Sequence, residues 1–100
     1  MSVIAKLHKK NNTTVIAVCD RTLLGTRLEE NGIVLDINSD FYNGAEYDDA
    51  TIGDLIRNAD TVNLVGEESV TLGIKEGIID KTLIKKVKGV PYAQAIILHD

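Results

Sequence analysis

The sequence predicts an α+β fold: a single domain spanning residues 1–100, with a mainly antiparallel sheet and two principal helices packed on one side of it. In the first forty residues, turn-forming pairs separate segments in which apolar and polar residues alternate, which is typical of β-hairpins. Residues 48–76 instead show helical periodicity on either side of a short apolar segment. Hairpins followed by a helix–strand–helix segment favour α+β over a doubly wound parallel sheet.

The first hairpin is expected to join strands at residues 3–9 and 13–19. The turn between them is Asn11-Asn12, and asparagine tolerates the positive φ angles that tight hairpins need. This turn places Leu7 opposite Ile16, so that apolar side chains gather on one face of the hairpin.

A second hairpin is expected at about residues 26–30 and 33–37, because Asn31-Gly32 is a strong signal for a two-residue turn. Its register pairs Leu28 with Leu35. The apolar side chains expected to share its inward face are Leu28, Ile33, Leu35 and Ile37.

Helices are predicted at three places. Asp20 is a candidate N-cap for one helical turn that stops at Gly25. A longer helix runs from Asp48 or Asp49 to about Ala59, with one apolar stripe along it. Another begins at Gly66, with Glu67 complementing the helix dipole in the first turn, and it needs no capping partner from elsewhere in the chain.

Short strands are expected at residues 61–65, 83–88 and 92–98. The apolar faces of strands and helices then converge on one core. Its predicted members are Leu7, Ile16, Val18, Leu35, Ile52, Leu55, Ile56, Leu64 and Val70.

Charge is distributed unevenly along this chain, although its net charge is only -4. Residues 1–30 hold five basic and three acidic side chains, residues 31–80 hold two and eleven, and residues 81–100 hold four and one. If strands from both ends of the chain are neighbours in the sheet, their lysines form one patch that contacts phosphates. The predicted nucleic-acid-binding residues are Lys6, Lys9, Lys10, Lys81, Lys85, Lys86 and Lys88. A solvated surface with an accidental imbalance explains the same pattern.

The sequence contains no recognisable catalytic or metal-binding pattern. Cys19, His8 and His99 are the only soft or imidazole ligands, and they lack the short spacings of metal sites. No serine lies in the strand-to-helix context of a nucleophile, and the cradle around Gly66 lacks the further glycines and the lysine of a phosphate-binding loop. We therefore expect no catalytic residue, metal or cofactor.

Several short segments together resemble a small archaeal family known as domain of unknown function 424, sometimes described as RNA-binding. In order, they are Cys19-Asp20-Arg21-Thr22-Leu23-Leu24-Gly25, Phe41-Tyr42-x-Gly44, Asn63-Leu64-Val65-Gly66-Glu67, Gly77-Ile78-Ile79-Asp80 and Gly89-Val90-Pro91-Tyr92-Ala93-Gln94. The resemblance implies a cytoplasmic α+β protein of about this length without an established reaction. Tyr92 stands where the family commonly has histidine.

Three functions remain open from the sequence. The first is a non-catalytic protein that associates with RNA or with translation. The second is a subunit that binds a partner protein, and the third is a small enzyme. The residues that would line its pocket are Asn63, Gly66, Glu67, Pro91 and Gln94. The start of the chain lacks the layout of a secretion signal and no apolar run is long enough to span a membrane, so we expect a cytoplasmic protein without membrane contact.

Overall fold

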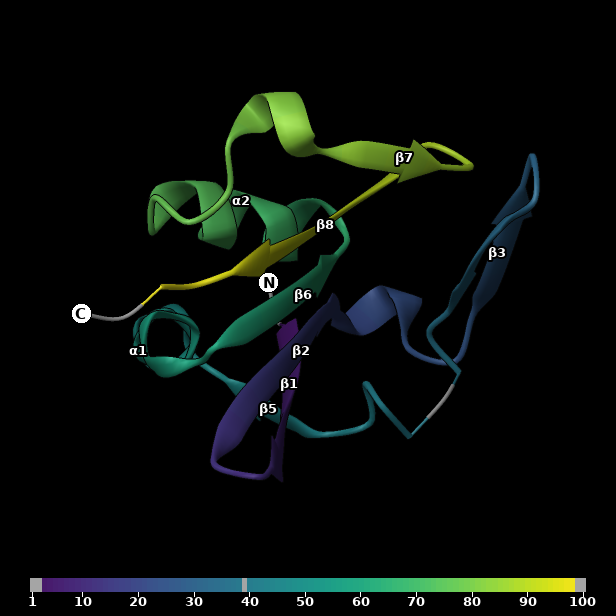
Figure 1. Cartoon of the computed structure of the whole chain (residues 1–100). Coiled ribbons are helices and arrows are strands. Elements are labelled where there is room, and N and C mark those ends of the chain that lie inside the picture. The colour runs from purple at the N-terminus through teal and green to yellow at the C-terminus, as the bar shows by residue number, and fades with distance from the viewer. Residues whose placement is uncertain (1–2, 39, 99–100) are drawn as a thin grey trace.

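Six strands form one sheet in the computed structural model of the chain, which describes residues 3–38 and 40–98 (Figure 1). The strand order is β5-β1-β2-β6-β8-β7. The strands are β1 Val3–Lys10, β2 Thr13–Asp20, β5 Ala45–Tyr47, β6 Thr61–Val65, β7 Lys85–Val87 and β8 Val90–Ile96. Neighbouring strands are antiparallel except β2 and β6, which are parallel.

Two helices, α1 Asp49–Asn58 and α2 Glu67–Lys75, pack against one face of this sheet, so the predicted fold class is confirmed. A separate hairpin consists of β3 Arg27–Glu30 and β4 Ile33–Asp36. Single helical turns occur at η1 Arg21–Leu23 and η2 Lys81–Leu83. In the described residues, neither α-helix is long and apolar enough to cross a membrane.

Both hairpins have the registers that their turns predict. Leu7 lies opposite Ile16 in the first hairpin, and Leu28 lies opposite Leu35 in the second. The asparagines of the first turn have φ angles of 52° and 66°, in the left-handed region that this turn requires. Local turn chemistry is therefore enough to fix both pairings.

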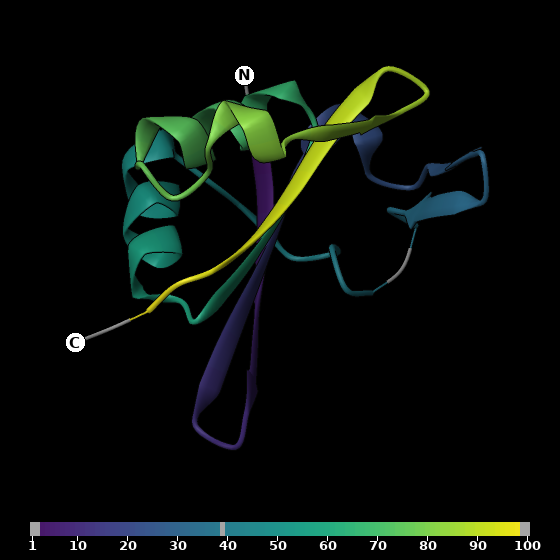
Figure 2. The same cartoon turned by 45° about the horizontal axis from the view of Figure 1, so that its top comes forward.

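The main core lies between the sheet and the two helices, and it contains most of the predicted members. Leu7 is an exception, because 41% of it is exposed. Strand β5 pairs with β1 only from Val3 to Ala5, so Leu7 lies on a free edge, where the first hairpin extends beyond the helices (Figure 2). Leu55 packs on this core while remaining partly exposed.

A second, smaller core lies on the opposite face of the sheet, beneath the β3–β4 hairpin. Ile37 and Cys19 are fully buried there, and Leu35 belongs to this cluster instead of the main core. The predicted inward face of the hairpin is wrong for Ile33, which is 44% exposed. Ile33 directly follows the turn, at the end of a hairpin that stands apart from the main sheet (Figure 1).

The last two strands meet in a tighter turn than the sequence predicts. Lys88 and Gly89 form it, with φ angles of 52° and 78°, so Val90 and Pro91 belong to β8. Lys88 therefore does not continue the alternation of β7, and its backbone N–H donates to Glu30 of the second hairpin at 3.1 Å.

Asp20 caps a helix, although not the one that follows it in sequence. Its side chain makes no capping hydrogen bond to η1. Instead its carboxylate accepts from the backbone N–H groups of Glu68 and Ser69 and from the Ser69 hydroxyl, at 2.8–3.1 Å. Helix α2 does begin after Gly66 with Glu67 in its first turn, as predicted, but its cap comes from β2.

Candidate functional site

One face of the sheet is left open by α1 and α2, and the strand register places a row of polar side chains across it. Lys6 pairs with Ala17, Ala17 with Asn63, and Asn63 with Gln94. Directly paired residues point to the same side of a sheet. The row therefore runs from an ammonium group on β1 to two amides on β6 and β8.

A second row on the same face is mostly apolar. It passes through Ile4, Cys19 and Val65 to Tyr92 on β8 and Lys85 on β7. The second hairpin approaches this row from the β7 side, where β3 and β4 contact β7 and Leu35 joins the same apolar cluster. Tyr92 remains partly exposed, next to the two amides.

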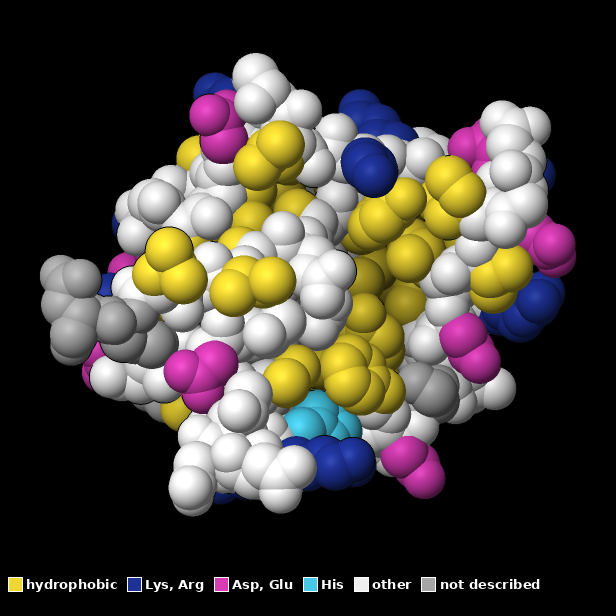
Figure 3. All heavy atoms as spheres, viewed as in Figure 1, with side chains coloured by type: hydrophobic (Ala, Val, Ile, Leu, Met, Phe, Trp, Pro, Cys, Tyr) yellow, Lys and Arg dark blue, Asp and Glu magenta, His cyan; other side chains and the backbone are white. Residues whose placement is uncertain are grey.

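A groove of about 440 Å³ lies where the two rows meet. This volume is within the range of roughly 300–1,000 Å³ in which proteins hold small ligands. Figure 3 shows the hollow as a strip of apolar side chains, with a histidine and a basic side chain at one end. The lining residues are Leu35, Tyr42, Asn63, Leu64, Val65, Leu83, Lys85, Tyr92, Ala93 and Gln94.

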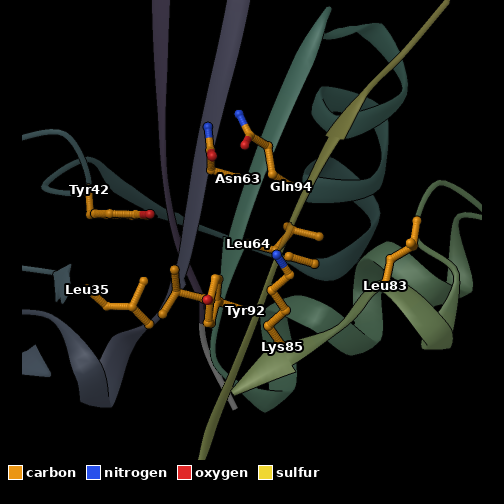
Figure 4. A pocket seen from close by; sticks show the side chains of 10 residues that line it. Leu35, Tyr42, Asn63, Leu64, Leu83, Lys85, Tyr92 and Gln94 are labelled. Carbon is orange, nitrogen blue, oxygen red and sulfur yellow. The ribbon is translucent and has the colours of Figure 1, made fainter. Parts of the chain in front are cut away.

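The two amides in this groove are free to bind a ligand. The side chains of Asn63 and Gln94 make no hydrogen bond within the described part of the chain, and their polar atoms are not buried. They point the same way from neighbouring strands (Figure 4). Each amide offers two N–H donors and a carbonyl acceptor, so the pair presents a dense set of hydrogen-bonding positions.

Two aromatic rings accompany the amides. Tyr42 extends into the groove from the segment that precedes β5, and Tyr92 stands on β8 (Figure 4). Both rings are partly buried. Lys85, directly opposite Tyr92, adds a positive charge at the edge of the groove.

The segment that carries Tyr42 is fastened to β1. Lys6 donates from Nζ to the backbone carbonyl of Asp40 at 2.8 Å. His8 donates from Nε2 to the carbonyl of Phe41 at 2.9 Å, and the two rings are stacked with their centroids 4.6 Å apart. These contacts hold one wall of the groove in place against the sheet.

Burial perturbs two acidic groups beneath this wall. Burial, and to a smaller extent the charge of Asp20, raise the pKa of the Cys19 thiol to about 11. Burial and the neighbouring Cys19 raise the pKa of Tyr42 to about 12. Cys19 is fully buried and protonated at neutral pH, which makes it a core residue and a poor nucleophile.

The stability of the protein is therefore expected to fall in alkaline solution. In the unfolded chain the thiol ionises near pH 9.0, whereas in the folded chain it keeps its proton up to about pH 11. Between these values the unfolded state binds fewer protons, so the free energy of unfolding decreases as the pH rises, by about 2 kcal/mol between pH 8 and 11. Urea unfolding of the wild type and of Cys19→Ala measures this loss. An equally steep loss in both proteins would contradict the assignment to Cys19.

The predicted lysine patch does not form as expected, because the strand order separates its two halves. Strand β1 lies next to one edge of the sheet, whereas β7 forms the opposite edge. Lys6 shares the open face with Lys85, which borders the groove. The other lysines lie at the tip of the first hairpin, in η2, on β7 and in the turn before β8, and they are Lys9, Lys10, Lys81, Lys86 and Lys88.

The residues of the predicted enzyme pocket fall into two groups. Asn63 and Gln94 lie in the groove. Gly66, Glu67 and Pro91 line a different depression, at the start of α2, and the Gly66 N–H donates to the Pro91 carbonyl at 2.8 Å. Glu67 is exposed and does not line the groove.

The aromatic residues look scattered in the sequence, but the fold brings Tyr42 and Tyr92 to one groove. Their meeting depends on two long-range pairings, of β8 with β6 and of β1 with β5. The one sequence signal was that both tyrosines lie within the segments that resemble the unknown-function family. Leu35 is a wall residue that sequence reasoning assigned only to the core.

Comparison with known proteins identifies the family and leaves its activity open. No curated protein matches this chain. A crystal structure of an uncharacterized conserved protein from the archaeon Methanopyrus kandleri is similar, with 29% sequence identity and a TM-score of 0.85, over 98% of this chain and 93% of that one. The family described as "Protein of unknown function (DUF424)" matches residues 8–98. Because that match covers most of the sequence, this chain belongs to the DUF424 family.

Proposed function

We propose that this chain is a non-catalytic protein that binds single-stranded RNA in the groove on the open face of its sheet. The observation that carries the proposal is the convergence of two tyrosine rings, two free amides and Lys85 in one groove. Unpaired bases expose both their ring faces and their hydrogen-bonding edges, which aromatic and amide side chains recognise. The cytoplasmic location and the link with translation that the sequence suggests are part of this proposal.

The charges near the groove also suit a nucleic acid. Lys85 borders the groove, and Lys6 lies on the same face two strands away from Asn63. Each is a point charge able to contact a backbone phosphate. Acidic side chains line a separate hollow beside the helices, and they are Asp49, Glu67 and Glu68.

Replacing Tyr42 by leucine is expected to weaken the binding of single-stranded RNA. Stacking of one base on an aromatic ring contributes about 1–3 kcal/mol, so the dissociation constant should rise roughly tenfold. Fluorescence anisotropy with a labelled single-stranded RNA of about nine nucleotides measures this change. Tyr47→Leu is the matched control, because Tyr47 is also partly exposed but lies on β5, outside the groove.

Circular dichroism of both variants first establishes that they are folded. Affinity should decrease with salt, because binding neutralises phosphates. An equal loss of affinity in both tyrosine variants would contradict the proposed site. Tighter binding to a duplex of the same length would contradict the preference for single strands.

A further inference from the structure

We infer that the groove recognises adenine, through the side-chain amides of Asn63 and Gln94; this inference rests on the proposed binding of RNA. The two residues are direct cross-strand partners on β6 and β8. Partners of this kind have Cβ atoms about 4.5–5.5 Å apart. Their amide groups therefore lie side by side, and neither makes a hydrogen bond within the described part of the chain.

The hydrogen-bonding edge of adenine matches a pair of amides. Its amino group at N6 has two hydrogens, and it lies between two acceptors, N1 and N7. One amide can accept the first hydrogen and donate to N7, which is the pairing that asparagine and glutamine make with adenine in DNA. The second amide can accept the other hydrogen and donate to N1. Adenine thus gives both amides a donor and an acceptor.

The other bases satisfy only part of this pair. In cytosine and uracil, the exocyclic group at C4 has the C5–H group on one side, which is not a hydrogen-bonding partner for an amide. The amide on that side can therefore make only one hydrogen bond. In guanine, O6 and N7 are both acceptors, so the amide on that side keeps its carbonyl unpaired. Groups left without partners in a complex reduce its affinity. Discrimination against these bases follows from the arrangement of the two amides.

The rest of the groove suits a flat heterocycle. Tyr42 lies on one wall and Tyr92 beside the amides, and aromatic side chains of this kind stack on bases (Figure 4). Lys85 lies opposite Tyr92, at the edge of the groove, where a phosphate attached to the bound nucleotide is within reach of a lysine. Stacking and charge contribute affinity for any nucleotide, whereas the two amides discriminate adenine from the other bases.

Short oligouridines that carry one central adenosine, guanosine, cytidine or uridine test this inference. In fluorescence anisotropy, the adenosine oligonucleotide should bind the wild type roughly tenfold more tightly than the others, which is the discrimination typical of one bidentate base contact. The same measurement on Gln94→Glu tests the role of the amide. A carboxylate only accepts, so it repels N1 or N7 of adenine and accepts from the N1–H and N2–H groups of guanine. The ratio of adenosine to guanosine affinity should therefore fall about tenfold or reverse.

Asn58→Asp is the matched control, because it makes the same amide-to-carboxylate change on α1, away from the groove. Asn58→Asp changes the net charge by the same amount as Gln94→Glu but lies outside the groove. It should therefore leave the ratio of adenosine to guanosine affinity unchanged. Equal binding of all four oligonucleotides to the wild type would overturn the adenine inference and leave RNA binding intact. If no oligonucleotide binds, both proposals fall. If adenosine monophosphate alone competes as well as the oligonucleotide does, adenine recognition stands and the RNA proposal is overturned.

Discussion

Replacing Leu64 by alanine is expected to lower the free energy of unfolding by about 2–5 kcal/mol. Leu64 lies on β6, in the middle of the sheet, and is completely buried in the core beneath the helices. The removed carbons leave a cavity, because a well-packed interior relaxes only in part. Urea denaturation of the wild type and the variant measures the loss.

Gly73 of α2 provides an internal check on this cavity. A Cβ at that position would lie 2.4 Å from Cδ1 of Leu64, so Gly73→Ala alone overpacks the core and is expected to cost about 1–3 kcal/mol. In the Leu64→Ala background the new methyl group enters space that the leucine has left. The double variant should therefore be more stable than the two single losses predict. Strict additivity would show that the helix and the strand do not pack as described.

Gly66→Ala is expected to destabilise the protein by about 3–5 kcal/mol, a loss that is exceptional for one methyl group. Gly66 has a φ angle of 106° and a ψ angle of 158°, a combination that is nearly restricted to glycine and costs an alanine about 1–3 kcal/mol. In addition, the new Cβ would lie 2.2 Å from Cγ of Asp20. Asp20 would have to move away from the backbone of α2, and the helix would lose its cap.

Gly25→Ala separates these two causes. Gly25 has a similar φ angle of 93°, but nothing lies within 4 Å of the Cβ that it would gain. Its substitution should cost only the backbone strain, about 1–2 kcal/mol. Urea denaturation gives both values. If the two alanine variants lose equal stability, the contact with Asp20 is not what requires glycine at position 66.

The sequence predicted only part of the candidate site. Asn63 and Gln94 are candidates from the sequence because each is an amide within a short apolar strand, and a buried amide needs a hydrogen-bonding partner. The sequence groups them with Gly66 and Glu67, because all four lie in the segments that carry the family resemblance. In the structure they are separated: the amides line the groove, whereas Gly66 and Glu67 line the depression at the start of α2.

The lysine prediction is incomplete for the same kind of reason. Charge along the chain indicates that both ends are basic, but it does not indicate which strands are neighbours. The parallel pairing of β2 with β6 brings β6 and β8 to one side of the first hairpin and leaves β7 at the far edge. Lys6 and Lys85 therefore share a face but lie on strands near opposite edges of the sheet.

Local chemistry determined much of this protein. The Asn11-Asn12 and Asn31-Gly32 turns fix two hairpin registers, and the apolar periodicity of residues 49–58 fixes the buried side of α1, because each signal acts among residues that are close in sequence. Strand order, the capping of α2 by Asp20 and the groove with its paired amides were decided only by the tertiary structure. They join segments that are 30 to 50 positions apart, and such pairings depend on how the whole chain buries its apolar surface and satisfies its polar groups.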